Sequence, residues 1–276
     1  MEVYILKSAA CLAILLLFYK VALERENMHV FKRFYLLFTL VLAAIIPLIT
    51  FKSYVTAPAA ADVVFTNASE NVTSRISESL QFNYRYLFYA LYAAGILFFS
   101  IKFFKNLYEL FSRIHKNPKV SFGASIRVLL KEKLPPHTFF QYIFLNKNEF
   151  ENDTIPKEVL KHEEAHSRQR HSLDIVLLEV FQIIVWFNPL VYLLKKSVKL
   201  NHEFLADSAV LKSGVNSHHY QHTLLNFSSK DLHSTLVNPI NYSSIKKRLT
   251  VMKTQTSKPV LWSKIVLIIP ILALLC

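Results

Sequence analysis

Glycine, cysteine and acidic residues are all scarce in this chain. Its 276 residues include 3 glycines and 2 cysteines, which excludes a collagen-like repeat and a disulfide-stabilised scaffold. Only 19 Asp and Glu stand against 32 Lys and Arg, so the formal net charge is +13. Apolar residues are abundant at 53%, which excludes intrinsic disorder. So large an apolar fraction beside so much positive charge indicates that the two kinds of residue are segregated along the sequence.

Long apolar runs are present, and their lengths are those of membrane helices. A helix needs about 20 predominantly apolar residues to cross the hydrocarbon core of a bilayer. Three runs come close to this length: residues 3–19, 34–51 and 86–101. A fourth run begins at Val260, contains Lys264 and Pro270, and is barely long enough to span. We therefore predict a mainly α membrane protein with about four transmembrane helices, rather than a large soluble protein with buried core helices.

The apolar stretch 173–194 differs from these runs. It contains Asp174 and Glu179, and Asn188-Pro189 interrupts it. Carboxylates are costly inside a bilayer, so a lipid-facing span is not expected here. We predict two short helices that break near Pro189 and are partly membrane-associated.

The distribution of Lys and Arg predicts the orientation of the spans. The loop after the first span and the region after the third are basic, whereas the loop 52–85 balances three basic against three acidic residues. We therefore place the N-terminus and this loop outside. The predicted domains are three transmembrane helices in 1–105, a cytoplasmic domain in 106–258 that includes 173–194, and a final span in 259–276. Basic residues beside membrane spans need no nucleic-acid partner, and the sequence shows no nucleic-acid reading motif.

The cytoplasmic region combines short strands with helices. The segments 122–130 and 139–146 are aromatic and β-branched, which predicts two strands. The next segment predicts a helix from about residue 156 to past 170, capped by Asp153 or Thr154. The predicted fold is thus a membrane protein with an α+β domain inserted before the last span.

The predicted helix carries the sequence His162-Glu163-Glu164-Ala165-His166. Residues four apart share one face of a helix, so His162 and His166 can direct two imidazoles at one Zn²⁺. Glu163 is then placed to polarise a zinc-bound water for attack on a peptide carbonyl. The pattern also arises by chance, so the surrounding sequence has to show whether it marks a zinc site.

A catalytic zinc needs a third protein ligand and an open fourth position. The segment 200–210 has helical character and places Glu203 and Asp207 one turn apart. We predict that Glu203 binds zinc and that Asp207 hydrogen-bonds the free ring nitrogen of a zinc-bound His. The competing third ligands are His202 and Glu179, which we rank below Glu203.

Other polar residues have weaker claims to the site. Asp174 lies eight residues after His166 and is a second candidate for supporting a ligand. The remaining downstream histidines are predicted to be ordinary surface or interface residues: His171, His218, His219, His222 and His233. A second metal site built from His218, His219 and His222 is the alternative.

Three segments lie among the predicted spans: His162-Glu-Glu-Ala-His, Trp186-Phe-Asn-Pro-Leu-Val-Tyr and Asn201-His-Glu-Phe-Leu-Ala-Asp. Together they resemble the BlaR/MecR-type membrane metallopeptidases, a family of antirepressor and sensor-transducer peptidases. The pairing of HExxH with ExxAD is more distantly similar to the CAAX prenyl proteases and to HtpX. The resemblance implies a gluzincin-like zinc metalloendopeptidase in which His162, His166 and Glu203 bind zinc and Glu163 is the catalytic base.

The resemblance also bears on signalling. In antibiotic-sensing members an extracellular penicillin-binding domain follows the final span, and a cytoplasmic repressor is cleaved. The sequence given ends at the final span, so either such a domain lies beyond Cys276 or the signal enters through the loop 52–85 and the membrane helices.

The resulting prediction is a zinc endopeptidase of the bacterial inner membrane that cleaves a cytoplasmic regulator, such as a transcriptional repressor, in signal transduction. Its partners are the lipid bilayer and that protein substrate, and a homodimer is compatible with this interpretation. We expect the substrate to add as a strand along an edge near 139–146, and His202, Tyr220 or Tyr242 to stabilise the oxyanion. The alternative is a non-catalytic membrane receptor or scaffold whose metal site is structural and closed by four protein ligands.

Overall fold

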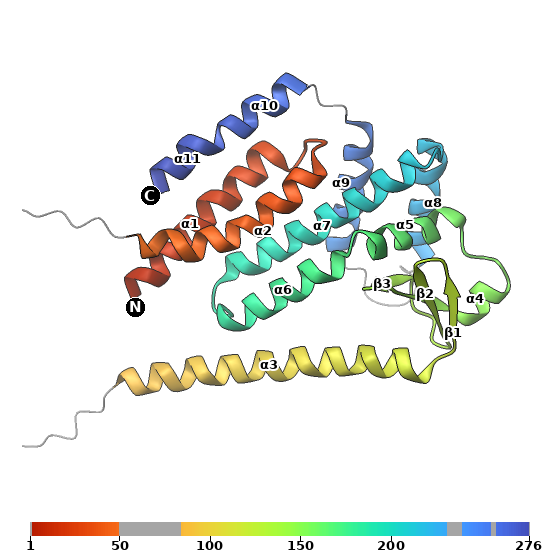
Figure 1. Cartoon of the computed structure of the whole chain (residues 1–276), viewed down its shortest axis with the longest axis horizontal. Helices are drawn as coiled ribbons and strands as arrows, with labels where there is room; N and C mark the ends of the chain where they lie inside the picture. The colour runs from red at the N-terminus through yellow and green to blue at the C-terminus, as the bar shows by residue number, and fades with distance from the viewer. Residues whose placement is uncertain (1, 50–83, 231–238, 255–257, 276) are drawn as a thin grey trace, which may run out of the picture.

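The computed structural model describes residues 2–49, 84–230, 239–254 and 258–275 (Figure 1). Within these ranges the chain is mainly helical and has a small four-stranded sheet. The first two helices, α1 (Glu2–Phe18) and α2 (His29–Ile45), form a hairpin. A π-helical turn (Tyr19–Leu23) extends α1, and a 3₁₀ turn (Ile46–Leu48) extends α2.

Among the described residues, three helices are long and apolar enough to cross a membrane: Val3–Leu23, His29–Leu48 and Arg85–Lys116. They contain the whole of the first and third apolar runs and residues 34–48 of the second, as predicted. Residues 50 and 51 of that second run lie outside the described residues. The third helix, α3 (Tyr84–Lys116), is much longer than its apolar run and continues through the basic residues that follow. Leu, Lys, Glu and Arg are good helix formers, so the change from apolar to charged residues does not end the helix.

The fourth apolar run forms two short helices in series, α10 (Lys258–Val266) and α11 (Ile268–Leu275). They contain 9 and 8 residues, and each alone is too short to cross the roughly 30 Å hydrocarbon core. The final transmembrane span therefore stays a prediction. The side chain of Lys264 in α10 forms an ion pair with Glu26 in the loop between α1 and α2.

The hairpin of α1 and α2 packs against α6 (His171–Ile184) and α7 (Pro189–Lys212), and Figure 1 shows these helices side by side. One cluster of buried apolar side chains joins all four helices: Leu12, Leu16, Leu23, Leu36, Leu40, Leu178, Val191, Leu194 and Val198 among them. The break between α6 and α7 lies where the sequence predicts it, but the prediction of two short helices was wrong for the second one. Helix α7 has 24 residues and continues past residue 194 through the segment 200–210. The Asn188 side chain accepts a hydrogen bond from the backbone N–H of Leu190, and Pro189 occupies the first turn of α7.

Helix α3 runs apart from this group and contacts the C-terminal end of α6 (Figure 1). Gly95 packs on Trp186 so closely that a Cβ at this position would lie 2.1 Å from Trp186 Cε2. The Tyr92 hydroxyl donates to the carbonyl oxygen of Ile184 at 2.9 Å. Glycine is therefore required at position 95 for this close approach.

The sheet contains β1 (Lys119–Phe122), β2 (Ser125–Leu130), β3 (His137–Phe139) and β4 (Tyr142–Asn146) in the order β1-β2-β4-β3. Strands β2 and β4 are parallel, and the outer pairs are antiparallel. The prediction of two strands was incomplete, because each predicted segment is interrupted by a turn. Gly123 (φ 58°) and Phe140 (φ 52°) adopt left-handed backbone conformations at these turns.

The strand order also corrects the expected edge. β4 pairs with β2 along its whole length and with β3 over Tyr142–Phe144, so of the expected range 139–146 only Phe139 belongs to the outer strand. The outer strand beside α5 (Lys157–Arg168) is β3. Helix α5 covers the sheet through a buried cluster that includes Ile143, Leu145 and Ile155. A short helix, α4 (Lys147–Glu151), connects β4 to this segment.

Helix α5 differs from its prediction at both ends. Its N-cap is Pro156, without a side-chain cap, so neither Asp153 nor Thr154 plays that role. The helix ends at Arg168, because Arg170 adopts a left-handed conformation (φ 53°, ψ 42°) and α6 begins at the next residue. Two further helices, α8 (Ser217–Lys230) and α9 (Pro239–Lys253), complete the surroundings of α5 and α7.

Candidate metal centre

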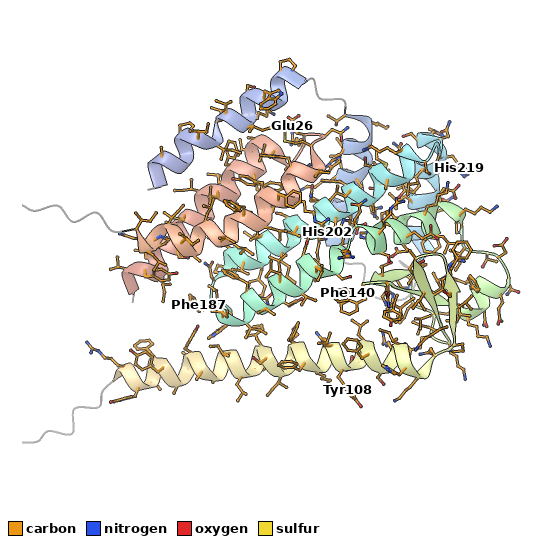
Figure 2. The ribbon with its side chains drawn as sticks, viewed as in Figure 1. Glu26, Tyr108, Phe140, Phe187, His202 and His219 are labelled. Atoms are coloured by element: carbon orange, nitrogen blue, oxygen red, sulfur yellow. The ribbon has the colours of Figure 1, made fainter. Side chains whose placement is uncertain are left out.

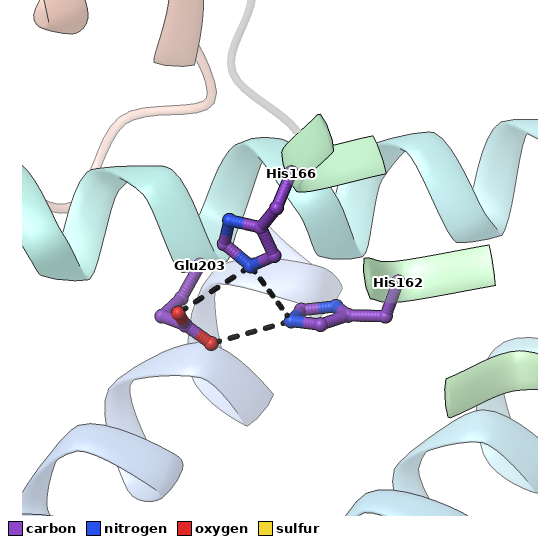
Figure 3. Close-up of side chains that lie close together, drawn as sticks. All are labelled: His162, His166 and Glu203. Carbon is purple, nitrogen blue, oxygen red and sulfur yellow. Dashed lines mark hydrogen bonds and ion pairs between the residues drawn. The ribbon is translucent and has the colours of Figure 1, made fainter. Parts of the chain in front are cut away.

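Helices α5 and α7 bring three potential metal ligands together. His162 and His166 come from successive turns of α5, and Glu203 comes from α7. The Nε2 atoms of the two histidines are 3.1 Å apart. The Glu203 carboxylate lies 3.4 Å from Nε2 of His162 and 3.6 Å from Nε2 of His166. Figure 3 shows the three side chains pointing toward one another.

The spacing of these atoms suits a zinc ion. Zn²⁺ binds His nitrogen and carboxylate oxygen at about 2.0–2.2 Å in a tetrahedral arrangement, which separates the ligand atoms by about 3.3–3.5 Å. The three separations here range from 3.1 to 3.6 Å. Two imidazoles and one carboxylate are also a common donor set of catalytic zinc sites. Within the described part of the chain, no fourth His, Cys, Asp or Glu joins this cluster.

Glu163 lies beside the cluster and is held by the edge strand. The Thr138 hydroxyl lies 2.7 Å from Oε2 of Glu163 and 3.1 Å from its backbone carbonyl oxygen. Burial raises the pKa of the Glu163 carboxyl to about 7, since only 8% of the residue is exposed. A carboxyl group with this pKa can accept and return a proton near neutral pH.

A cavity of about 380 Å³ opens onto the site. Both histidines, Glu163 and Glu203 line it, together with residues of the β3 segment, α8 and α9: Pro135, Pro136, His137, Thr138, Tyr220, Leu224, Phe227 and Arg248. Of the residues predicted to stabilise an oxyanion, Tyr220 lines the cavity and His202 does not. The side chain of Tyr242 lies outside the described part of the structure.

Asp207 lies one turn beyond Glu203 and supports the cluster from behind. Its Oδ1 atom lies 3.3 Å from Nδ1 of His162 and accepts a hydrogen bond from the Tyr220 hydroxyl at 2.7 Å. The Arg248 guanidinium donates to both oxygens of Asp207 at 2.6 and 2.8 Å, and pairs with Glu203 at 2.8 Å. Asp207 thus lies beside His162, and its role in supporting a zinc-bound His stays a prediction. Arg248 was not predicted. Arg248 ends the run Lys246-Lys-Arg, which in sequence is indistinguishable from ordinary surface charge.

These contacts fix the protonation of the cluster. Burial lowers the pKa of His162, but hydrogen bonds to Asp207 and Glu203 outweigh it and raise that pKa to about 9. Burial raises the pKa of Asp207, but the charge of Arg248 outweighs it and brings that pKa to about 2. Burial lowers the pKa of His166 to about 4. At neutral pH the metal-free protein therefore carries a proton on His162 that a metal must displace.

The competing ligands have other partners. His202 Nε2 lies 2.7 Å from Oδ2 of Asp174, and Figure 2 shows His202 where α5, α6 and α7 meet. Glu179 pairs with Lys195 at 2.5 Å. Asp174 touches none of the three clustered side chains directly. Neither His202 nor Glu179 belongs to the cluster.

His171 was predicted to be an ordinary surface or interface residue, and that prediction was wrong. It is 3% exposed, and its Nδ1 atom lies 2.7 Å from Nδ1 of His166. The error follows from the predicted extension of the helix past residue 170, because nothing in the local sequence signals the left-handed Arg170. His218, His219 and His222 are exposed on α8, and His233 lies outside the described residues. Among the described residues they form no metal cluster.

Comparisons with known proteins agree with this geometry. The family model of the BlaR1 peptidase M56 matches residues 144–252, which include the whole cluster. Regulatory protein BlaR1 of Bacillus licheniformis is 30% identical over 227 residues, or 74% of this chain and 38% of that protein. Regulatory protein BlaR1 of Staphylococcus aureus is 32% identical over 83 residues, or 28% of this chain and 14% of that protein. The chain thus spans well under half of the length of these relatives. It belongs to the BlaR1 peptidase M56 family.

Proposed function

We propose that this chain is a membrane-embedded zinc endopeptidase that cleaves a cytoplasmic regulator, such as a transcriptional repressor, in signal transduction. The observation that carries the proposal is the cluster of His162, His166 and Glu203 with Glu163 beside it on the wall of one cavity. Membership of a peptidase family supports the activity. The relatives are named regulatory proteins, which supports a role in regulation.

In the proposed mechanism the protein positions the proton carrier and the peptide. His162, His166 and Glu203 would hold the zinc, which when bound supplies Lewis-acid chemistry and lowers the pKa of a coordinated water to about 7. Glu163 accepts the proton of the attacking water and then returns it to the leaving amine. The Thr138 hydroxyl keeps the carboxylate of Glu163 turned toward the cavity.

The peptide substrate is proposed to lie along the edge strand. His137 and Thr138 of β3 line the cavity, and β3 pairs with β4 on one side only. Main-chain hydrogen bonds to an exposed edge would hold an extended peptide with its scissile bond near Glu163. This position moves the edge expected near residues 139–146 to β3, which ends at Phe139.

The alternative function, a receptor or scaffold with a structural metal site, requires a closed set of ligands. Structural zinc sites have four protein ligands, whereas catalytic sites keep one position open. The described residues provide three. The open cavity beside them favours the enzyme.

We further propose that the chain lies in the bacterial inner membrane with the N-terminus outside and residues 106–258 in the cytoplasm. The basic loops support this orientation. A cysteine introduced within 52–85 should react with a membrane-impermeant maleimide added to intact spheroplasts, and protection of that cysteine would invert the topology. A final span within 259–276 and a homodimer stay predictions.

The peptidase proposal is tested with Glu163→Gln in the full-length chain, purified in detergent. A defined peptide library is the probe, and mass spectrometry detects its cleavage products. Glu164→Gln is the matched control, because it makes the same change one residue away and Glu164 lies outside the cavity, paired with Arg127 at 3.3 Å.

We expect the wild type and both variants to bind one zinc per chain. Cleavage by Glu163→Gln should fall by about 10²–10⁴-fold, whereas the control should stay within a few-fold of the wild type. Full cleavage by a zinc-loaded Glu163→Gln protein would show that Glu163 is not the base. A wild type that binds no zinc would refute the proposed function itself.

A further inference from the structure

A buried path of polar contacts connects the membrane helix α2 to the candidate zinc ligand His166. It starts at Arg33 of α2, whose Nε and Nη2 atoms donate to the two oxygens of Asp174 at 2.7 and 3.0 Å. Asp174 also lies 2.7 Å from Nε2 of His202. The ring of His202 lies flat on that of His171, with centroids 4.1 Å apart and planes at 3°.

A second arm of the path leads from Arg33 to His171. The Nη1 atom of Arg33 donates to the backbone carbonyl oxygen of Gln169 at 2.9 Å. The side-chain oxygen of Gln169 lies 3.1 Å from Nε2 of His171. Both arms therefore converge on His171, whose Nδ1 atom is 2.7 Å from Nδ1 of His166.

The directions of these hydrogen bonds are mutually consistent. His166 presents Nε2 to the cluster, so its Nδ1 carries the ring proton and donates to Nδ1 of His171. Nε2 of His171 then donates to the side-chain oxygen of Gln169. In metal sites, a hydrogen bond to the free nitrogen of a ligating imidazole fixes its tautomer and ring orientation.

We propose that Arg33 is a positioning residue of the metal centre: it fixes His171, and through His171 the imidazole of His166. The inference rests on the proposed zinc site. Arg33 lies outside the residues 144–252 that the family model matches, and it lies within the candidate membrane span His29–Leu48. The orientation of a metal ligand thus depends on a side chain supplied by a membrane helix.

The alternative is that the pair of Arg33 and Asp174 only holds helices together. The chain offers a matched control for that role. Lys195 of α7 pairs with Glu179 of α6 at 2.5 Å, so this pair also links a cation on one helix to a carboxylate on α6. Neither of these two residues contacts any of the three clustered side chains. Loss of either pair should lower the stability of the fold, but only loss of Arg33 should change the affinity and geometry of the metal site.

The experiment uses the full-length chain in detergent and measures two properties of the site. Competition with a chromophoric chelator gives the Zn²⁺ dissociation constant. The visible d–d absorption of the fully Co²⁺-loaded protein reports the geometry of the ligands. The variants are Arg33→Met, Arg33→Lys, His171→Phe, the double variant Arg33→Met/His171→Phe and the control Lys195→Met.

We expect His171→Phe to weaken zinc binding by about 10–100-fold and to change the Co²⁺ spectrum, because Phe keeps the ring stacking but accepts no hydrogen bond from His166. Arg33→Met should act in the same direction, and Arg33→Lys should recover part of the loss. The double variant should bind zinc no more weakly than His171→Phe alone, since the two residues act in series. Lys195→Met should match the wild type in both measurements.

Two results would overturn the inference while leaving the peptidase proposal intact. One is an Arg33→Met protein with the zinc affinity and Co²⁺ spectrum of Lys195→Met. The other is a His171→Phe protein that binds zinc as tightly as the wild type, and this variant tests the path even if Arg33→Met fails to fold. A wild type that binds neither metal would instead refute the proposed function, and this inference with it.

Discussion

Replacing Asp207 by Asn tests how the candidate metal centre is supported. Asp207 is 2% exposed and receives two hydrogen bonds from Arg248 and one from Tyr220. Asn keeps the shape of the side chain but removes its charge and turns one acceptor into a donor. That donor would face the guanidinium of Arg248, and His162 would lose its carboxylate partner.

The expected loss of stability follows from the pKa of Asp207. The folded protein lowers this pKa from 3.8 to about 2, and each unit corresponds to about 1.4 kcal/mol, so the ionised carboxylate stabilises the metal-free fold by about 2 kcal/mol at pH 7. Because the folded pKa is the lower one, this contribution is present above about pH 4 and disappears as the pH falls toward 2. Removing an outer carboxylate also weakens metal binding, by about 10–100-fold.

Both effects are measurable on one preparation. The thermal midpoint of the metal-free variant at pH 7 should fall by roughly 4–8 °C, and this difference should narrow below pH 4. Chelator competition gives the zinc affinity. Asp153→Asn is the control, because Asp153 is exposed and its left-handed conformation (φ 51°) suits Asn. Equal zinc affinities for Asp207→Asn and Asp153→Asn would refute the supporting role of Asp207.

Two further predictions concern proton release and helix packing. The metal-free site holds the pKa of His162 at about 9 and that of His166 at about 4, so zinc uptake should release one proton from His162. Zinc affinity should therefore rise about tenfold per pH unit between about pH 5 and 8, and a flat profile would contradict this. Gly95→Ala should displace Trp186, because the added Cβ would lie 2.1 Å from its ring. The fluorescence emission of Trp186 should therefore shift, measured in a Trp262→Phe background that removes the other tryptophan. Ala94→Val, an exposed neighbour on α3, should leave that emission unchanged.

The sequence predicted the features that depend on local periodicity. The i,i+4 spacing of His162 and His166 is a property of one helix, so it was visible without a structure. The same holds for the apolar runs that became α1, α2 and α3. The break near Pro189 carries its own local signal. Glu203 could be predicted because it lies in a second recognisable segment, residues 201–207, on another helix, and the structure places it in the cluster.

The features that were missed depend on contacts between distant parts of the chain. Arg248 contacts Asp207 across 41 residues, and Arg33 contacts Asp174 across 141. Thr138, 25 residues before Glu163, lies in a short edge strand that the sequence did not predict. Neither an arginine within a short basic run nor a single threonine has a periodic pattern, so only the folded chain shows which carboxylate each of them contacts.

The apolar cluster shared by α1, α2, α6 and α7 bears on how peptidase regions can be exchanged among relatives. The segment that defines the family, 144–252, includes α6 and α7 but excludes the hairpin that covers them. A chimera that carried this segment alone would set its Asp174 against a foreign residue at position 33 and its Val191 and Leu194 against foreign apolar side chains. The unit that can be transplanted therefore begins in the first membrane helix, and the boundaries drawn by sequence similarity are narrower than those drawn by packing.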